Sequence, residues 1–258
     1  MKIAIDAGHG YNTKGKRTPD GIREWTLNNA VAKYLAEYLK GYATTFRTDD
    51  TTGKTDVSLS IRRNNAVKNG ANLLISIHHN AYTGKWNNAT GVEAFRHTLY
   101  SHKQAKELTS KLAAAISKST GLKNRGAKTG LLGVIATSKI PCILCEGGFM
   151  DSKNDYKVIT SEAGQKAYAK AVADTIISYY GLKKAATKTT TKTTTSKEYK
   201  VKINTAVLNV REGAGVKYKV RTTVKKGEVY TIVETKGNWG KLKSGAGWIS
   251  LTYTKKVK

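Results

Sequence analysis

The sequence has little cysteine, little proline and few acidic residues, and it lacks a long hydrophobic run. Two cysteines and two prolines occur in 258 residues, and 18 Asp and Glu stand against 45 Lys and Arg. No stretch approaches the ~20 apolar residues that a membrane-spanning helix needs. Asp6 and His9 interrupt the apolar residues at the amino terminus, so we expect no signal peptide and no membrane insertion. We therefore expect synthesis in the cytoplasm, and any action outside the cell needs another route of release.

The two cysteines are too few for a structural zinc site with four thiolate ligands. Cys142 and Cys145 have the spacing of a redox pair, but they lie in an apolar, strand-like run over residues 140–146. A redox pair of this spacing normally begins a helix, and residues three apart on a strand point to opposite faces. We interpret both cysteines as small core residues.

The excess of positive charge is extreme, with a formal net charge of +27. Residues 1–181 carry 26 basic and 14 acidic side chains, and residues 182–258 carry 19 and four. The carboxyl-terminal part is therefore far more basic per residue. Such a chain is expected to bind polyanions, which include nucleic acid, an anionic membrane surface and an anionic cell-wall polymer.

The composition divides the chain into three parts. Residues 183–198 read Lys-Lys-Ala-Ala-Thr-Lys-Thr-Thr-Thr-Lys-Thr-Thr-Thr-Ser-Lys-Glu, which leaves almost nothing to bury. We predict a first domain over residues 1–181, a Lys/Thr-rich linker over residues 182–198 and a second domain over residues 199–258. The first part is long enough for a full-sized domain and the last for a small one.

Apolar strand-like runs alternate with helical patterns in the first part. Strands are predicted at residues 3–5, 44–48, 71–80, 91–95 and 140–145, and helices at residues 26–39, 58–68, 103–119 and 163–180. This alternation predicts an α/β fold with three layers, in which a twisted, mostly parallel sheet has helices on both faces. The short runs at residues 206–210, 228–234 and 247–251 predict a small β-barrel at the carboxyl terminus.

Three groups that can bind a metal or move a proton lie at the ends of predicted core strands: His9, His78 and Glu146. In an open α/β sheet, the carboxyl ends of different strands meet at the crevice where ligands bind. Two histidines and one carboxylate are a ligand set of catalytic zinc, and a further carboxylate can transfer the proton of a bound water. Glu24 lies just ahead of the helix predicted at residues 26–39, where it is equally well explained as a helix-start carboxylate. The residues predict a hydrolytic metal site and leave the roles of the two carboxylates open.

Four motifs carry a resemblance to a known family. They are Ile5-Asp-Ala-Gly-His-Gly10, the glutamate at position 24, Ser76-Ile-His-His-Asn-Ala81 and Glu146-Gly-Gly-Phe149. In this order they resemble the zinc-dependent N-acetylmuramoyl-L-alanine amidases of autolysins and phage endolysins, over residues 1–180. The same pattern includes Leu59 and Arg62 ahead of Ala66, and Asn154-Asp155.

The resemblance implies that His9, Glu24 and His78 bind Zn²⁺ and that Glu146 is the catalytic carboxylate. The family has one histidine at the position of His78 and usually a small residue after it, whereas this chain has His79 there. On a strand, the ring of His79 should face away from that of His78. We therefore favour His78 as the ligand and keep His79 as the alternative.

The implied reaction is hydrolysis of the amide that joins the lactyl group of N-acetylmuramic acid to L-alanine in peptidoglycan. A neutral amide is a poor electrophile with a poor leaving group, so it needs both a Lewis acid and a proton donor. Zinc would polarise the carbonyl and activate water, and Glu146 would pass a proton to the departing amine. Further contacts to the ligands or to the substrate are expected from Asp6, Asn80 and Arg62.

Residues 199–258 resemble a bacterial SH3-like cell-wall-binding domain. The resemblance rests on Leu208-Asn-Val-Arg211 followed by Gly213 and Gly215, on Lys225-Lys-Gly227, on Trp239-Gly-Lys241 and on Gly247-Trp-Ile249. It implies that Arg211 lies at the rim of the core. We expect Tyr230 and Trp239 to bind the wall, with filling of the barrel as the alternative, and Trp248 to lie in the core.

Three alternatives stay open. A nucleic-acid-binding protein would explain the charge through a salt-sensitive affinity for DNA, but the sequence has no recognisable motif for it, and anionic wall polymers explain the charge equally well. A wall-binding protein with an inactive catalytic domain is the second, although every candidate ligand and the candidate base are present. The third alternative keeps the fold and the metal but cleaves a peptide bond elsewhere in the stem peptide.

As the biological setting, we favour a phage or prophage endolysin that reaches the wall through a holin-made lesion.

Overall fold

The computed structural model of the chain describes residues 1–100, 102–185 and 198–257. The chain divides into two compact units, Met1–Ala185 and Ala186–Lys258, each with a hydrophobic core of its own. Of the predicted linker, residues 186–197 lie outside the described residues. Among the described helices, none is both long and apolar enough to cross a lipid bilayer.

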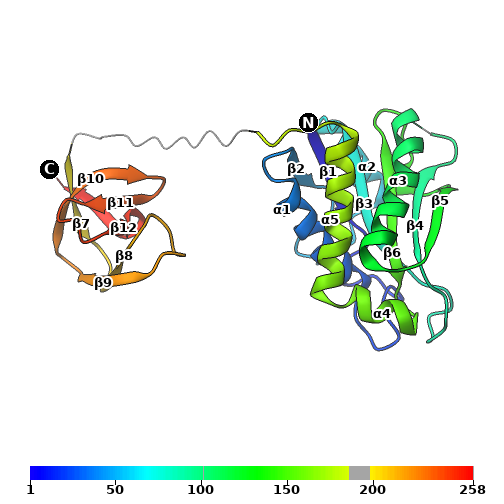
Figure 1. The fold of residues 1–258 in the computed structure, drawn as a ribbon, viewed down its shortest axis with the longest axis horizontal. Coiled ribbons are helices and arrows are strands. Elements are labelled where there is room, and N and C mark those ends of the chain that lie inside the picture. The colour runs from blue at the N-terminus through cyan, green and yellow to red at the C-terminus, as the bar shows by residue number, and fades with distance from the viewer. Residues whose placement is uncertain (101, 186–197, 258) are drawn as a thin grey trace. The chain divides into compact units, whose positions relative to one another are not determined.

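The first unit is built on a six-stranded sheet with the strand order β2-β1-β3-β6-β4-β5 (Figure 1). Neighbouring strands are parallel, except that β4 is antiparallel to β6. The prediction of a mostly parallel sheet is therefore confirmed. The strands are β1 Lys2–Ala7, β2 Thr44–Arg47, β3 Leu73–Asn80, β4 Val92–His97, β5 Asn124–Gly130 and β6 Cys142–Phe149.

Helices cover both faces of this sheet and complete the predicted three layers. One face packs against α1 (Glu24–Leu39), α3 (Lys103–Thr120) and α5 (Glu162–Tyr179), which lie in front of the sheet in Figure 1. The other face packs against α2 (Leu59–Lys68) and the short 3₁₀ helix η1 (Gly133–Ile135). A further short helix, α4 (Lys153–Ile159), follows β6.

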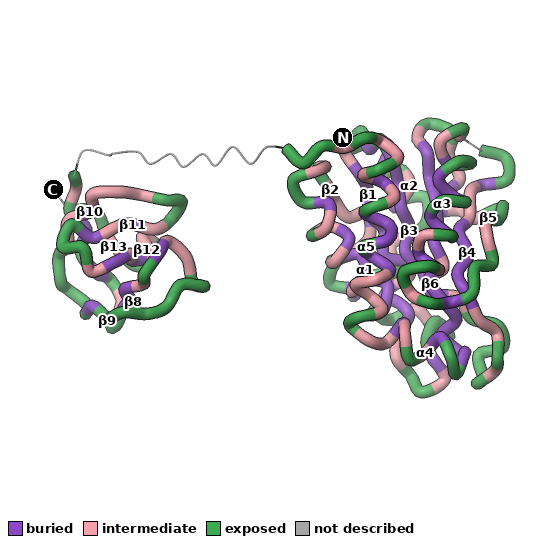
Figure 2. Tube along the Cα trace, viewed as in Figure 1, coloured by how far each residue is buried: buried purple, intermediate pink, exposed green. Residues whose placement is uncertain are grey.

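The alternation of side chains along each strand supplies both cores. Ile3 and Ile5 of β1 pack towards α1 and α5, whereas Ala4 packs towards α2. The central strands are buried on both sides, and Figure 2 shows this buried centre. Cys145 belongs to the first core and Cys142 to the second, both as free thiols, which agrees with their interpretation as core residues. Burial raises the pKa of Cys142 to about 12, so this thiol is unreactive.

Three elements of the first unit were not predicted, namely β5, α4 and η1, and several boundaries differ from the predicted ones. Strand β6 extends to Phe149, so Glu146 lies within the strand rather than after it. The edge strand β5 reads Asn-Arg-Gly-Ala-Lys-Thr-Gly, which has no apolar alternation, and it forms through parallel pairing with β4. Helix α4 has seven residues, too few for a periodic pattern to emerge. Helix α1 begins at Glu24 rather than at residue 26, so Glu24 is its first residue instead of a residue ahead of it.

The second unit is an antiparallel seven-stranded sheet with the order β13-β7-β10-β11-β12-β8-β9. Its core consists of Val201, Ile203, Leu208, Val210, Val224, Ile232, Leu242 and Ile249. Trp248 is half-buried outside this core, with the Lys241 ammonium 6.0 Å from its ring centroid, so its predicted core position is wrong. The strands are β7 Tyr199–Ile203, β8 Val207–Arg211, β9 Val220–Lys225, β10 Val229–Lys236, β11 Trp239–Leu242, β12 Trp248–Ser250 and β13 Thr254–Val257.

Candidate active site

The predicted site residues lie together at one edge of the first unit's sheet. Because β1, β3 and β6 are parallel, their carboxyl ends share this edge, and His9 follows β1 directly. His78 near the end of β3 is aligned with Glu146 on β6. Glu24 comes from the first turn of α1. The loops that follow β1 and β3 extend beyond this edge, at the lower end of the sheet in Figure 1.

Glu24 lies between the two histidine rings. Its Oε2 is 3.2 Å from Nε2 of His9, and its Oε1 is 3.1 Å from Nδ1 of His78. The two rings meet edge to face with centroids 5.0 Å apart. Each residue offers one ligand atom, and these atoms lie within 4.8 Å of one another. Imidazole nitrogens and a carboxylate oxygen in this arrangement can hold a divalent metal ion such as zinc.

The backbone before His9 is shaped to bring the rings together. A Cβ on Gly8 would lie 2.0 Å from Cε1 of His78, so glycine is required for the close approach. His9 itself has a φ of 64°, a left-handed conformation that a non-glycine residue rarely adopts. Such a conformation persists where the surroundings fix it, and it is common at functional sites.

The buried guanidinium of Arg62 fixes this backbone. Its Nη1 donates to the carbonyl oxygen of Ala7 at 2.7 Å and to Oδ1 of Asp6 at 2.9 Å, and its Nη2 donates to the carbonyl oxygen of His9 at 2.8 Å. Asp6 also accepts hydrogen bonds from Ser76 on β3 at 2.7 Å and from Thr48 at 3.1 Å. Asp6 and Arg62 therefore lie beneath the site and support it from the core side.

Electrostatics suit two of the three candidate ligands, Glu24 and His9, to a cation. The pKa of His78 is raised instead, because the hydrogen bond and the charge of Glu24 outweigh the effect of burial. Burial favours a neutral Glu24 carboxyl, but the hydrogen bond and charge of His78, together with His9, outweigh burial and lower the pKa of Glu24. Burial lowers the pKa of His9 to about 4, which leaves its ring neutral at pH 7. A carboxylate and a neutral imidazole are the forms in which these residues bind metal.

Glu146 has the environment of a proton-transfer group. Its side chain is partly exposed, but its Oε2 is buried and makes no hydrogen bond to the residues that the structure describes. Burial raises the pKa of Glu146 to about 7. A carboxyl that titrates near neutral pH can both accept and donate a proton, as general acid–base catalysis requires.

His79 and Asn80 take different places at the end of β3. Nδ1 of His79 is 2.8 Å from Oδ1 of Asn28, and its ring meets the edge of Tyr168 with centroids 5.8 Å apart, away from the clustered ligand atoms. Asn80 accepts a hydrogen bond from the Ala81 backbone at 2.8 Å. Asn28 was not predicted as a site residue from the sequence, and it also donates to Oε1 of Glu24 at 3.2 Å. Its position one helical turn after Glu24 was the available signal.

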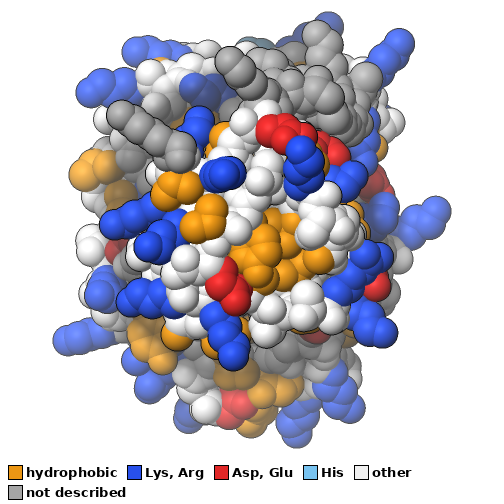
Figure 3. Space-filling model, turned by 90° about the vertical axis from the view of Figure 1, so that its left-hand side faces the viewer, with side chains coloured by type: hydrophobic (Ala, Val, Ile, Leu, Met, Phe, Trp, Pro, Cys, Tyr) orange, Lys and Arg blue, Asp and Glu red, His pale blue; other side chains and the backbone are white. Residues whose placement is uncertain are grey.

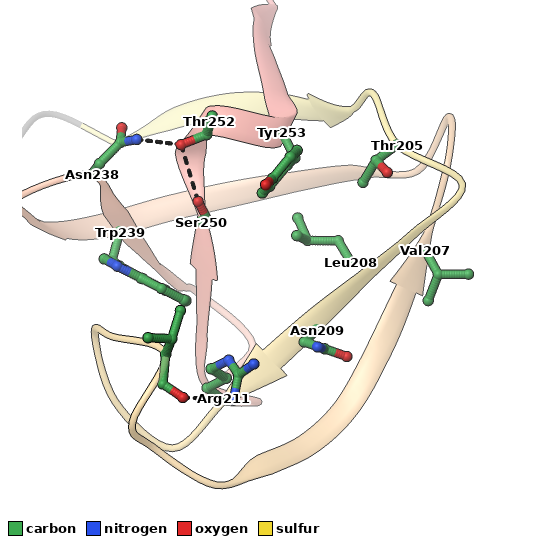
Figure 4. Close-up of a pocket in the computed structure, with 11 residues that line it drawn as sticks. Thr205, Val207, Leu208, Asn209, Arg211, Asn238, Trp239, Ser250, Thr252 and Tyr253 are labelled. Carbon is green, nitrogen blue, oxygen red and sulfur yellow. Dashed lines mark hydrogen bonds between the residues drawn. The ribbon is translucent and has the colours of Figure 1, made fainter. Parts of the chain in front are cut away.

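The second unit contains a cavity of about 490 Å³ (Figure 4). Trp239 lies at its wall, whereas Tyr230 lies outside the lining and donates a hydrogen bond to Oε2 of Glu228 at 2.9 Å. Arg211 borders the cavity, and its Nη1 donates to the carbonyl oxygens of Val216 and Tyr218 at 3.1 and 2.9 Å. The lining consists of Thr205, Val207, Leu208, Asn209, Arg211, Val216, Asn238, Trp239, Ser250, Thr252 and Tyr253.

The basic residues of the sequence are displayed on the surface. The face shown in Figure 3 carries many Lys and Arg side chains and few acidic ones, around a smaller hydrophobic patch. The cavity of the second unit is different, because Arg211 is its single charged lining residue. Attraction to a polyanion and recognition in the cavity therefore depend on different side chains.

Two protein-family models match the chain. One is described as N-acetylmuramoyl-L-alanine amidase and matches residues 3–178, and the other is described as Bacterial SH3 domain and matches residues 206–255. The matches agree in place with the two structural units.

Individual amidases and an endolysin are also similar to this chain in sequence or in structure. The N-acetylmuramoyl-L-alanine amidase CwlM of Bacillus licheniformis is 33% identical over 193 residues, which cover 72% of this chain and 71% of that protein. The endolysin of Bacillus phage SPP1 is 29% identical over 189 residues, with 70% and 67% covered. The crystal structure of an N-acetylmuramoyl-L-alanine amidase from Clostridium difficile 630 superimposes with a TM-score of 0.64 at 29% identity and covers 70% of this chain and 96% of that one.

Proposed function

The chain belongs to the N-acetylmuramoyl-L-alanine amidase family, and we propose that it hydrolyses the peptidoglycan amide between N-acetylmuramic acid and L-alanine with zinc and Glu146. The observation that carries this proposal is the cluster of His9, Glu24 and His78 at the sheet edge that also presents Glu146. The cluster supplies a metal site, and Glu146 supplies a carboxyl able to transfer protons.

Zinc is the metal that this donor set fits. Imidazole nitrogen is a donor of intermediate softness and carboxylate oxygen is a hard donor, and zinc binds both. Three such ligands leave a fourth coordination position open, as in catalytic zinc sites. When bound, zinc polarises a carbonyl and lowers the pKa of water from ~15.7 to ~7. His9, Glu24 and His78 would hold the ion, and Asn28 and Arg62 would keep Glu24 and His9 in place through their hydrogen bonds.

Glu146 moves the proton in the proposed reaction. Its carboxylate accepts a proton from the attacking water, whose oxygen forms a bond to the lactyl carbonyl carbon. The same carboxyl then donates that proton to the nitrogen of L-alanine as the carbon–nitrogen bond breaks. The products are a lactyl carboxylate on the glycan and a peptide with a free L-alanine amino terminus. A pKa of about 7 suits both transfers.

The biological setting that we propose is a phage or prophage endolysin released through a holin-made lesion. Similarity to the endolysin of phage SPP1 supports this setting. The net charge of +27 supports additional attraction to anionic wall polymers. External lysis of cells should then weaken steeply as salt is raised, because salt screens this attraction.

Mass spectrometry of digested peptidoglycan tests the function. We expect new L-alanine amino termini while the glycan chains stay intact. A new terminus elsewhere in the stem would instead identify a different peptidase on the same fold, and shortened glycan chains would identify a glycosidase. Digestion that continues after nuclease treatment would exclude nucleic acid as an intermediary in lysis.

Trp239 gives a separate prediction for wall binding by the second unit. The Trp239→Ala variant of the full chain should bind purified walls about tenfold more weakly in a sedimentation assay, because an aromatic anchor in a cavity carries much of a binding energy. Trp248→Ala is the matched control, since it removes the same half-buried aromatic side chain at a position outside the cavity lining. Unchanged binding of the Trp239 variant, or an equal loss in both variants, would contradict a role for this cavity.

A further inference from the structure

A second cavity, of about 380 Å³, opens beside the active site in the first unit. Its floor includes Phe149, the last residue of β6, three positions after Glu146. One wall comes from the loop that connects β3 to β4, and the other is Arg125 of β5. The lining consists of Tyr82, Asn87, Asn88, Ala89, Arg125 and Phe149.

The sheet topology explains why this cavity adjoins the catalytic groups. β4 and β5 run opposite to β6, so their amino-terminal ends lie at the edge where β3 and β6 end. Arg125 is the second residue of β5 and therefore belongs to this edge. Phe149 is aligned with Asn80 of β3, two residues after His78. The cavity thus continues the active-site edge towards β5.

The loop that forms the wall is held in place by two buried carboxylates. Oδ2 of Asp151 accepts the backbone N–H groups of Tyr82, Thr83 and Gly84 at 2.9, 2.8 and 2.8 Å. At the other end of the loop, Oδ2 of Asp155 accepts the N–H of Gly91 at 2.9 Å, and it also accepts that of Phe149 at 3.0 Å. The wall and the floor share these anchors, so the cavity is formed before a ligand arrives.

Arg125 presents a positioned positive charge to the cavity. Its Nε donates to the buried Glu93 carboxylate, and its guanidinium carbon lies 5.0 Å from the centroid of the Phe149 ring. Its two terminal nitrogens make no hydrogen bond to the residues that the structure describes, and the side chain is 38% exposed. A guanidinium held at Nε keeps its terminal N–H groups free for a carboxylate of a ligand.

We propose that this cavity binds the stem peptide beyond the scissile amide, with Arg125 pairing with a peptide carboxylate. The proposal rests on the proposed function, which places an N-acetylmuramoyl-peptide at the neighbouring edge. A peptide offers both apolar side chains for Phe149 and Tyr82 and a carboxylate for Arg125. On the glycan side of the substrate, the lactyl carboxyl forms part of the amide bond and carries no charge. The N-acetylmuramic acid therefore offers no carboxylate to Arg125.

Steady-state kinetics on two soluble N-acetylmuramoyl-peptides test the assignment. The peptides have the same sequence, and their carboxyl groups are free in one and amidated in the other. We expect Arg125→Gln to raise KM about tenfold for the free-acid peptide, with kcat retained, and to leave KM for the amidated peptide unchanged. This pattern would separate binding of a carboxylate from general damage to the site.

Two further variants make the result specific. Lys128→Gln removes the same charge from an exposed position of the same strand outside the cavity lining, and it should leave both KM values unchanged. The double variant Glu93→Gln with Arg125→Gln avoids an unpaired buried carboxylate, so it keeps the test valid if the single variant folds poorly. It should show the same selective loss for the free-acid peptide.

An equal rise in KM for both peptides, or no rise for either, would overturn the proposal. A KM that responds to glycan length in the variant but not to the peptide carboxylates would assign the cavity to the glycan instead. Calorimetric binding of both peptides to the Glu146→Gln protein separates this question from the proposed function. Weaker binding of the free-acid peptide on adding Arg125→Gln would support the subsite even if wild-type turnover were absent.

Discussion

Glu146→Gln should lower kcat for amide hydrolysis by at least about a thousandfold while zinc still binds. A positioned general acid–base group is worth about 10²–10⁴ in rate, and Glu146 is proposed to act in both proton transfers. Glutamine keeps the shape of the side chain but cannot accept the proton of water. Oε2 of Glu146 makes no hydrogen bond to the residues that the structure describes, so the substitution breaks none there and the fold should not be destabilised.

The control is Glu93→Gln on the neighbouring strand, where Glu93 is aligned with Glu146. Glu93 is also a buried carboxylate, but it pairs with Arg125 and lies outside the ligand cluster. We expect kcat to change less than tenfold in that variant. Bound zinc is counted by metal analysis of both purified proteins. If Glu146→Gln retained ordinary turnover, or lost its metal together with its activity, the proton-transfer role would have to be abandoned.

Removal of metal should abolish hydrolysis, and added zinc should restore it. The reason is that no other described group near Glu146 replaces a Lewis acid for a neutral amide. The fold should survive, because the hydrophobic core of the first unit does not include the three candidate ligands. At a zinc concentration a hundredfold above its Kd, binding stabilises the native state by about 2.7 kcal/mol. The expected observation is a metal-dependent melting temperature with an unchanged far-UV spectrum.

His78→Ala is the matched variant for this experiment, and His79→Ala is its control. His78 contributes an atom to the ligand cluster, whereas His79 bonds to Asn28 instead. Zinc should raise the melting temperature of the His79 variant and leave that of the His78 variant unchanged. Full activity in the chelated wild-type enzyme would refute the metal mechanism. A zinc response lost in the His79 variant alone would make His79 the ligand.

The order of motifs along the chain already located most of the site. His9, His78 and Glu146 could be found because each follows or ends an apolar, strand-like run in the sequence, and the carboxyl ends of parallel strands meet. The strand alternation also placed Cys142 and Cys145 on opposite faces. These inferences depend on local periodicity, which a single sequence contains.

Other features depend on contacts between distant segments, and these could not be read from the sequence. Strand β5 has no apolar pattern and exists because β4 offers it a free edge. Trp248 looks like a core residue by type, yet the second unit fills its buried core with aliphatic side chains. Arg62 was expected near the ligands, but its actual partners, the carbonyl oxygens of Ala7 and His9 more than 50 positions earlier, came only from the structure.

The sequence by itself determined the alternation of strands and helices, the two-domain composition, the net charge and the residue types able to bind a metal. Apart from the family resemblance, only the tertiary structure decided which carboxylate lies between the histidines and which one stands apart. Glu24 reaches the rings because it lies in the first turn of α1. Oε2 of Glu146 has no hydrogen-bond partner within the described residues, and β6 holds it on the far side of β3 from β1. Both are glutamates, and the difference in their pKa values comes from their surroundings, which exist only after the chain has folded.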